Sequence, residues 1–375
     1  MNWFLIRIID KFVGIPLILA AAFASKLFCV KKTAADPRTI LLIKFWGLGN
    51  VMMLLPCVWA LKQRYPNASL DILTLSQNES ALSAMKPFSS VLTIDTKNPR
   101  AFVGSLLHTI KTVSNAYDLV IDCEEFARVS ALITVAARAP RSIGFRTFGQ
   151  LRHFGYTDVV SYEDDRHVHL TFTQLLAPLH ISVDTGNRPV PFKHPCAVDF
   201  TAPYAVIHPG TSINAPLRRW PAERYALVCA HLAQHRGLKI ILTGTPEERT
   251  LCQRIADLTT LDDNVSVSCD RDLPSFCALI ENASLVIAAD TLAVHAASYF
   301  NRPVIGLYGP NTPLLYGPWS KKSKAIFAGL SCSPCITNFN DKFNVCRHRL
   351  GKGHCMSVIE PSAVINAADE LLTSP

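Results

Sequence analysis

The chain has 375 residues, of which 49% are apolar and 18% are charged. It is therefore too long for a single small core and too apolar for a disordered protein, and two domains of ordinary size are expected. The net charge of +8 permits an anionic ligand or surface but identifies neither.

The first 35 residues are both basic and apolar. Five basic residues against Asp10 give this segment a net charge of +4, half of the excess of the whole chain. The basic residues are Arg7, Lys11, Lys26, Lys31 and Lys32. At helical spacing, Arg7, Asp10, Lys11 and Gly14 form a polar stripe, and Trp3, Phe4, Ile8, Phe12 and Ile15 form the other face.

An uncharged run follows from Phe12 to Ser25. It would cover about 21 Å as a helix, against roughly 30 Å of bilayer hydrocarbon. We therefore expect residues 1–35 to lie on a membrane surface as a peripheral helix. A spanning helix, a helix packed on the protein and a cleaved signal are the alternatives.

Strands and helices alternate from Asp36 onward, which predicts a parallel sheet in a domain of residues 36–195. The predicted strands are Thr39–Phe45, Leu70–Leu75, Val91–Ile94 and Asp118–Asp122, and a helix is predicted over Val51–Arg64. Gly49 belongs to a glycine turn after the first strand, where loop amides can approach a ligand closely. A tight turn without a ligand is the alternative.

A proline-rich stretch between Asp184 and Pro203 predicts a linker to a second domain, residues 196–375. The strands predicted there are Tyr204–His208, Leu238–Thr243, Val265–Ser268, Leu285–Ala289 and Pro303–Tyr308, with helices at Pro221–His235, Glu247–Leu258 and Leu273–Asn282. The predicted fold class is α/β, with two doubly wound, Rossmann-like domains that face a central cleft.

Polar residues follow the first strand of the second domain. Thr211 and Ser212 lie in the loop after it, and Arg218 precedes the next helix. Hydroxyls, loop amides and a guanidinium group at one sheet edge suit a pyrophosphate, because arginine binds phosphate oxygens bidentately.

Two further strand ends carry candidate ligand contacts. Glu247 or Glu248 could accept hydrogen bonds from ribose hydroxyls, although glutamates in a first helical turn are also common without a ligand. Asp290 and Thr291 end a strand and start a helix, so Asp290 is an N-cap, a ligand contact or both. His295 lies on that helix, and a buried histidine with a structural role is the alternative there.

Five motifs of the chain, in this order, closely resemble glycosyltransferase family 9, the heptosyltransferases of lipopolysaccharide core assembly. They are HPGTS, RRWPAERYA, ILTGTPEE, AADTLAVHAA and VIGLYGPNTP. The resemblance implies a GT-B fold whose C-terminal domain binds a nucleotide sugar, typically ADP-heptose, and whose N-terminal domain binds the acceptor. It also implies an inverting reaction without a catalytic metal.

The resemblance assigns a role to each matching residue. Thr211 and Ser212 match a hydroxyl pair at the phosphates, and Arg218 matches a basic residue near them. Glu247 matches the ribose-binding glutamate. Asp290 and Thr291 match a pair that lies against the donor sugar and diphosphate, with His295 one turn along, and Gly49 belongs to the first loop.

The chain departs from the family pattern at two positions. Asn50 stands where the family has an aspartate, the proposed general base, and an amide cannot take a proton at neutral pH. Leu292 stands where the family usually has glycine. We therefore look for another carboxylate, and propose Glu124, then Glu125 or Asp122, because they follow a strand of the first domain. Capping of a helix is the alternative role for these acids.

Four of the twelve cysteines, Cys332, Cys335, Cys346 and Cys355, crowd into an excursion of residues 332–355. The first pair has zinc-knuckle spacing, so a structural zinc ion, two disulfides or free thiols are the options. Asp270 and Asp272 resemble the carboxylate pair of metal-dependent sugar transferases, but a chance match is favoured and no catalytic metal or other cofactor is expected.

The sequence thus predicts an enzyme that transfers a sugar, expected to be heptose, from an ADP-sugar to a lipopolysaccharide-core or other lipid-linked acceptor. The enzyme is expected in the cytoplasm, peripheral on the inner face of the inner membrane, without nucleic acid as a partner. A nucleotide-sugar-binding scaffold that has lost turnover and a nucleotide-sugar epimerase are the alternative functions.

Overall fold

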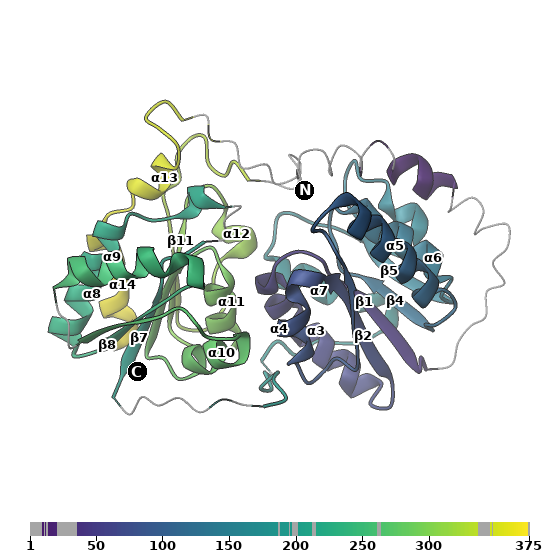
Figure 1. The fold of residues 1–375 in the computed structure, drawn as a ribbon, viewed down its shortest axis with the longest axis horizontal. Coiled ribbons are helices and arrows are strands. Elements are labelled where there is room, and N and C mark those ends of the chain that lie inside the picture. The colour runs from purple at the N-terminus through teal and green to yellow at the C-terminus, as the bar shows by residue number, and fades with distance from the viewer. Residues whose placement is uncertain are drawn as a thin grey trace. The chain divides into compact units, whose positions relative to one another are not determined.

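The structure, a computed structural model, describes residues 10, 12, 14–20, 36–186, 188–194, 196, 202–211, 215–260, 264–336, 346 and 348–373. The chain divides into two compact units, Met1–Lys193 and His194–Pro375, called unit 1 and unit 2 below. The division falls inside the predicted linker (Figure 1). Among the described residues no helix has the length and apolarity that a membrane span needs.

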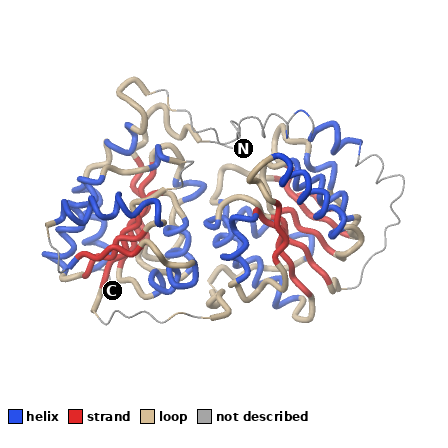
Figure 2. Tube along the Cα trace, viewed as in Figure 1, coloured by secondary structure: helices blue, strands red, loops and turns tan. Residues whose placement is uncertain are grey.

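Unit 1 is a parallel sheet of six strands in the order β3-β2-β1-β4-β5-β6. The strands are β1 (Thr39–Ile43), β2 (Ser69–Leu75), β3 (Val91–Ile94), β4 (Leu119–Asp122), β5 (Arg141–Arg146) and β6 (Asp158–Ser161). The helices are α3 (Leu48–Arg64), α4 (Glu79–Ser83), α5 (Pro99–Val113), α6 (Arg128–Ala137) and α7 (Val168–Gln174). Helices cover the sheet (Figure 2), so β1 and β4 are buried and read as continuous apolar runs.

Unit 2 repeats this design with a parallel sheet in the order β12-β11-β10-β7-β8-β9. Its strands are β7 (Tyr204–His208), β8 (Lys239–Thr243), β9 (Val265–Ser268), β10 (Leu285–Ala289), β11 (Val304–Tyr308) and β12 (Ser323–Phe327). Its helices are α8 (Ala222–Arg236), α9 (Arg249–Thr259), α10 (Leu273–Glu281), α11 (Leu292–Tyr299), α12 (Pro313–Tyr316), α13 (His354–Ser357) and α14 (Pro361–Thr373). All five residues of β10 are buried, so this strand forms the centre of the core.

The strand order reverses once in each sheet, between β1 and β4 in unit 1 and between β7 and β10 in unit 2. At such a switch point the loops that leave the two neighbouring strands diverge to opposite faces of the sheet and leave a crevice. Ile43 pairs with Asp122, and Ala288 pairs with His208. The loops that follow these residues are therefore the places to look for a site.

Every strand predicted from the sequence is present, with ends that differ by at most two residues. Three strands were missed, namely β5, β6 and β12. The last two are edge strands whose side chains are only partly buried, and their sequences therefore lack a strong apolar run. The predicted helix over Glu247–Leu258 is split, because a 3-10 turn, Pro246–Glu248, precedes α9. The predicted central cleft stays a prediction.

Candidate functional site

Arg218 and Asp290 meet at the switch point of unit 2. Nη1 of Arg218 lies 2.9 Å from Oδ2 of Asp290 and also donates to the backbone carbonyl of Asp290 at 3.2 Å. Asn311, which follows β11, donates to the same carboxylate oxygen at 2.7 Å. Asp290 therefore holds Arg218 in place. The Arg218 side chain as a whole keeps 23% of its surface exposed.

Two polar atoms beside this pair are enclosed without a hydrogen-bond partner among the described residues. They are Nε of Arg218 and Oγ1 of Thr291. Thr291 is the N-cap residue of α11 but its side chain makes no capping bond, so the amides of the first helical turn are also available. Buried polar groups without partners are costly, and an anionic ligand at this helix end would satisfy them.

Of the other predicted residues in unit 2, some lie beside the Arg218–Asp290 pair and some do not. His295 lies 3.8 Å from Oδ1 of Asp290 through Nε2, so the structure brings it to the same cluster. Thr211 is buried and donates its hydroxyl to the carbonyl of Ala215 at 3.0 Å, which closes the loop after β7. Ser212 lies outside the described residues.

The adjacent glutamates after β8 point in different directions. Glu248 is buried and completes a capping box with Thr245, whose backbone amide donates to it at 3.0 Å. Its carboxylate packs so closely on Gly210 that a Cβ there would overlap it. Glu247 is exposed, and hydrogen bonds from its own backbone amide and the Thr245 hydroxyl lower the pKa of its carboxyl. Of the two, Glu247 is the one a ligand can reach.

A separate pocket of about 460 Å³ lies at the opposite edge of this sheet. It is lined by Arg236, Leu238, Ser284, Pro303 and Lys322, with Leu371 and Leu372 of α14. These residues stand at or before the amino ends of β8, β10, β11 and β12 or on the neighbouring helices. Parallel sheets of this kind bind their ligands at the carboxyl ends, so the switch point is the better candidate.

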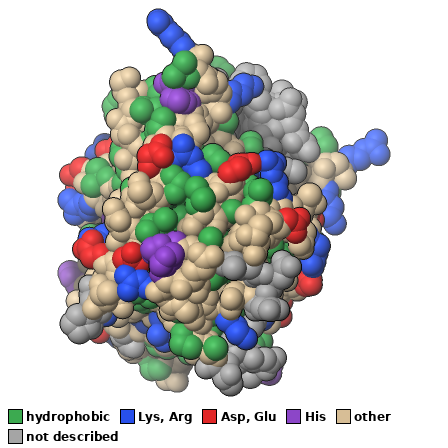
Figure 3. All heavy atoms as spheres, turned by 90° about the vertical axis from the view of Figure 1, so that its left-hand side faces the viewer, with side chains coloured by type: hydrophobic (Ala, Val, Ile, Leu, Met, Phe, Trp, Pro, Cys, Tyr) green, Lys and Arg blue, Asp and Glu red, His purple; other side chains and the backbone are tan. Residues whose placement is uncertain are grey.

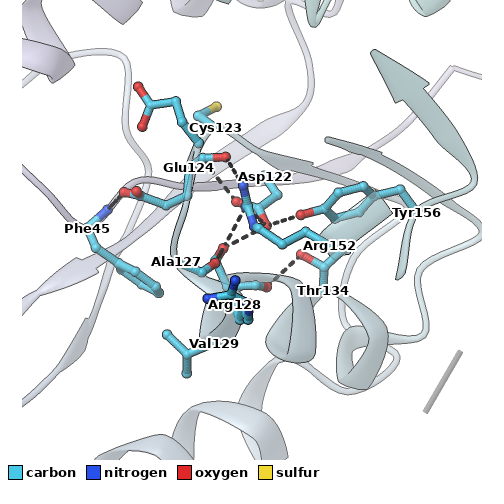
Figure 4. A network of polar contacts seen from close by, with 12 residues as sticks. Phe45, Asp122, Cys123, Glu124, Ala127, Arg128, Val129, Thr134, Arg152 and Tyr156 are labelled. Atoms are coloured by element: carbon cyan, nitrogen blue, oxygen red, sulfur yellow. Dashed lines mark hydrogen bonds and ion pairs between the residues drawn. The ribbon is translucent and has the colours of Figure 1, made fainter. Parts of the chain in front are cut away.

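In unit 1 the carboxylate of Asp122 is fully occupied. Arg152 and Ser130 donate to its Oδ2 at 2.8 Å each, and the hydroxyl of Tyr156 donates at 2.6 Å. The amide of Glu124 donates to Oδ1 at 3.0 Å. Figure 4 shows Arg152 and Tyr156 converging on Asp122. With these partners and no exposed surface, Asp122 has a structural role.

Glu124 and Glu125 flank a buried lysine that follows β1. Nζ of Lys44 donates to Oε2 of Glu125 at 2.8 Å and lies 3.6 Å from Oε1 of Glu124. The amide of Phe45 donates to Oε1 of Glu124 at 2.5 Å, as Figure 4 also shows. Oε2 of Glu124 is enclosed without a hydrogen-bond partner among the described residues. The three side chains of Lys44, Glu124 and Glu125 are completely buried.

Burial and charge set the pKa values of this group. Burial raises the pKa of Glu124, and the nearby charge of Lys44 only partly offsets this effect. Burial alone would lower the pKa of Lys44, but attraction by Glu124 and Glu125 outweighs it, so the pKa of Lys44 is raised. Lys44 is therefore a permanent cation, and Glu124 takes up a proton more readily than an ordinary glutamate.

Asn50 and Gly49 lie in the first turn of α3. The side-chain amide of Asn50 donates to the carbonyl of Trp46 at 3.1 Å and so braces the first loop. Gly47 has a φ of 75°, a conformation that favours glycine, and it is the residue that turns the chain into the helix. Gly49 belongs to unit 1, whereas the other predicted donor-binding residues belong to unit 2.

The four clustered cysteines line one small pocket of unit 2 together with His348. Burial and the neighbouring thiols raise the pKa of Cys355 to about 11. None of the four forms a disulfide. Within the described part of the chain, no group of three or more His, Cys, Asp or Glu side chains is arranged to hold a metal ion. Structural zinc and free thiols therefore stay open as the two remaining options.

The carboxylate pair of Asp270 and Asp272 has structural partners. Asp272 is the N-cap of α10 and accepts a hydrogen bond from the amide of Ser275 at 2.9 Å. Asp270 is paired with Arg249 at the surface. Neither contact requires a metal ion.

Sequence reasoning missed three residues that define the two switch points, namely Lys44, Arg152 and Asn311. Each is far in sequence from its partner, so periodicity within one segment does not reveal the contact, although Asn311 lies in the motif VIGLYGPNTP. The position of Lys44 directly after a buried strand gave a further signal, because a lysine enclosed at such a place needs carboxylate partners.

Known glycosyltransferases resemble the chain over most of its length. The family model described as glycosyltransferase family 9 (heptosyltransferase) matches residues 104–343, more than half of the chain. Lipopolysaccharide heptosyltransferase 3 of Escherichia coli K12 is 25% identical over 351 residues, covering 86% of this chain and 95% of the relative. Lipooligosaccharide heptosyltransferase 2 of Haemophilus influenzae is 24% identical over 320 residues, covering 76% and 88%.

Solved structures share the fold. A glycosyl transferase family 9 protein from Veillonella parvula aligns with a TM-score of 0.70 at 21% identity, covering 89% of this chain and 97% of its own. The E. coli heptosyltransferase WaaC with ADP aligns with a TM-score of 0.68 at 20% identity, covering 89% and 99%. The same enzyme with ADP-2-deoxy-2-fluoro heptose aligns with a TM-score of 0.67 at 19% identity, covering 88% and 99%. The predicted fold class, two Rossmann-like units of the GT-B type, is confirmed.

Proposed function

The chain belongs to glycosyltransferase family 9, and we propose that it transfers heptose from ADP-heptose to the core of lipopolysaccharide or a related lipid-linked acceptor. The relatives whose names specify heptosyl transfer to lipopolysaccharide or lipooligosaccharide support this substrate class. The WaaC structures with ADP and with an ADP-sugar analogue support the donor. Unit 2 would bind the donor, and unit 1 the acceptor.

The proposed site for the nucleotide sugar rests on one observation. Beside Asp290, at the switch point of unit 2, Nε of Arg218 and Oγ1 of Thr291 are enclosed without a hydrogen-bond partner among the described residues. A diphosphate would accept hydrogen bonds from Arg218 Nε, Thr291 Oγ1 and the first amides of α11. Glu247, exposed at the end of β8, would accept hydrogen bonds from the ribose hydroxyls. His295 would orient Asp290 from the second turn of the helix.

The reaction proposed is a direct, inverting displacement of ADP by an acceptor hydroxyl. The leaving diphosphate gains negative charge as the glycosidic bond breaks, and Arg218 with the α11 amides would stabilise that charge. These groups would perform the task for which other sugar transferases use a metal ion, and we propose on this ground that the enzyme needs none. Asp270 and Asp272, which cap α10 or pair at the surface, are left out of the reaction.

Glu124 is proposed as the general base in place of the family's aspartate. Its raised pKa keeps it basic enough to take a proton from a hydroxyl, and its Oε2 is the oxygen without a partner. Glu125 is bound to Lys44 and Asp122 to Arg152, which makes them weaker candidates than the sequence alone indicated. Because Glu124 is completely buried, the transfer requires that the acceptor hydroxyl reach its enclosed Oε2.

A second candidate function is binding of a nucleotide sugar without transfer. Two features favour it: Asn50 stands at the family's base position, and the three nearby carboxylates are all fully buried. Measurement of ADP release from ADP-heptose with and without a heptose-accepting core oligosaccharide separates the two functions. Transfer requires acceptor-dependent ADP release and a product heavier by one heptose. Thermal stabilisation by ADP-heptose without ADP release would support binding alone, and an isomerised donor would indicate an epimerase.

A further inference from the structure

The described part of the N-terminal segment is a helix that docks on unit 1 through Asp10. The carboxylate of Asp10 accepts hydrogen bonds from the amides of Arg128 and Val129, each at 3.0 Å, and contacts Nη1 of Arg128 at 3.2 Å. Arg128 and Val129 begin α6, whose own N-cap residue, Ala127, has no side-chain acceptor. Asp10 therefore caps α6 across 118 residues of sequence and fixes the orientation of its own helix.

The same side of the helix packs on the protein. Gly14 lies so close to Arg128 that a Cβ would be 3.0 Å from the Cβ of that residue. Ile18 is fully buried in a cluster with Ala131 and Tyr156. Asp10, Gly14 and Ile18 are spaced by four residues, so they form one face that packs on unit 1. Asp10 and Gly14 belong to the polar stripe predicted from the sequence, whose other members, Arg7 and Lys11, lie outside the described residues.

The outward side of this helix is apolar. Phe12 is 71% exposed, Leu17 is 49% exposed and Leu19 is 42% exposed, and the other exposed residues of 14–20 are Pro16 and Ala20. Among the described residues of this stretch, none of the exposed side chains is charged or polar. A helix on the surface of a water-soluble protein has the opposite arrangement, with its polar face toward the solvent. For comparison, the face of unit 2 in Figure 3 carries charges of both signs among small apolar areas.

A neighbouring loop adds to this surface. The carbonyls of Gly149 and Gln150 accept hydrogen bonds from the guanidinium group of Arg128, so the loop and the helix meet at that residue. Phe148 in this loop is 85% exposed, and Arg146 before it is exposed as well. The loop next to the helix thus adds an exposed aromatic side chain with an exposed cation two residues before it.

We infer that this surface, formed by Phe12, Leu17, Leu19 and the loop around Phe148, inserts into the headgroup region of an anionic lipid bilayer. The charge of the segment selects lipid over a protein partner, because residues 1–35 carry a net charge of +4 and anionic headgroups attract basic residues. Exposed apolar side chains beside basic residues are the pattern of a helix that lies in the membrane interface. This inference is independent of the proposed reaction, since lipid binding needs neither donor nor acceptor.

Sedimentation with vesicles tests the inference on the full-length chain. The protein is mixed with vesicles of phosphatidylethanolamine and phosphatidylglycerol, or with vesicles of phosphatidylcholine alone. We expect binding to the anionic vesicles that weakens with added salt, and a partition coefficient at least about tenfold lower for the triple variant Phe12→Ser, Leu17→Ser, Leu19→Ser. The matched control replaces three exposed leucines of unit 2, Leu227→Ser, Leu258→Ser and Leu314→Ser, and should bind as the wild type does.

A fluorescence reporter locates the contact. Because Trp3 lies in the same segment, the readout is the difference from the wild type: anionic vesicles should shift the tryptophan emission of a Phe12→Trp variant to shorter wavelength by more than that of the wild type, and that of a Leu258→Trp variant by no more. The inference is overturned if the wild type stays in the supernatant, or if the triple variant binds vesicles as well as the wild type while both melt at the same temperature. A wild-type dimer that the triple variant converts to monomer, without lipid binding, would instead assign the surface to a second copy and also overturn it.

Discussion

Asp122 and Arg152 form an ion pair of 2.8 Å inside unit 1 in which neither side chain has any exposed surface. The pair holds the loop after β4 to the turn that contains Arg152, because the same guanidinium group also donates to the carbonyl of Glu124. Removing one partner of such a pair leaves a charge buried without compensation. The pair is therefore a stability element of the switch point.

The Arg152→Met variant tests this role. We expect it to lower the free energy of unfolding by about 3–5 kcal/mol, as the loss of one partner of a buried pair commonly does. Chemical denaturation measures the change. Arg254→Met, which breaks the exposed pair with Glu223, is the control and should stay within about 1 kcal/mol of the wild type. Equal losses of unfolding free energy in the two variants would show that the buried charge of Asp122 does not need Arg152 for its stabilisation.

Replacement of Glu124 tests the general base. Glu124→Gln keeps an oxygen for the amides of Phe45 and Trp46 but removes the basic carboxylate. We expect kcat to fall by about 10²–10⁴-fold, with stabilisation by the donor unchanged. In the wild type, kcat/KM should rise with pH up to an apparent pKa above the ordinary 4.5 of glutamate, because burial raises the pKa of Glu124.

The other two acids provide the comparison for that experiment. Glu125→Gln and Asp122→Asn remove carboxylates that are bound to Lys44 and Arg152, so we expect them to reduce stability more than turnover. Full turnover by Glu124→Gln would reject Glu124 as the base. Partial recovery of activity on adding Asn50→Asp to the Glu124→Gln variant would indicate that either position can supply the carboxylate.

Arg218→Ala should weaken donor binding. The guanidinium group would form charge-assisted hydrogen bonds to the diphosphate, and losing them costs about 1.5–3 kcal/mol, or roughly 10- to 150-fold in affinity. Titration calorimetry with ADP-heptose measures the loss. Arg254→Ala, an exposed arginine on α9, is the matched control. If the Arg218 variant bound ADP-heptose as tightly as the wild type, the donor would not bind at the switch point of unit 2.

His208 should make stability depend on pH. Desolvation lowers the pKa of its ring below the ordinary 6.5, and the charge of Glu248 only partly offsets this effect. The folded state then prefers the neutral ring, so the contribution of His208 is fully present above about pH 6.5 and is lost as the pH falls toward its folded-state pKa. The unfolding free energies of the wild type and His208→Asn should diverge in that acidic window. Parallel curves would contradict the assignment.

Metal analysis and thiol counting decide the state of the four cysteines. If zinc, one of the three options, is bound, purified protein carries one zinc ion per chain, and Cys332, Cys335, Cys346 and Cys355 react with alkylating reagents only after a chelator is added. Chelation should then lower the melting temperature. Zinc-free protein whose exposed Cys332 reacts at once, and whose buried Cys355 reacts slowly because its pKa is about 11, would reject zinc and support free thiols.

Local patterns in the sequence were sufficient for the central strands. Runs such as LVIAA of β10 are buried on both faces, so each residue of the run has to be apolar. The missed strands show where this reasoning fails. β5 has arginine at both ends and a glycine inside, and the edge strands β6 and β12 are covered on fewer sides, so none of them needs a continuous apolar run.

The sequence by itself determined the two Rossmann-like units, the family, and the loops in which Arg218, Asp290 and Glu124 lie. Strand ends and glycine turns can be predicted because each depends on a few consecutive residues. Only the tertiary structure decided which side chains meet. It bound Asp122 to Arg152, buried Glu248 while leaving its neighbour Glu247 exposed, and turned Asp10 toward α6. These outcomes depend on partners that are distant in sequence, and periodicity within one segment carries no information about them.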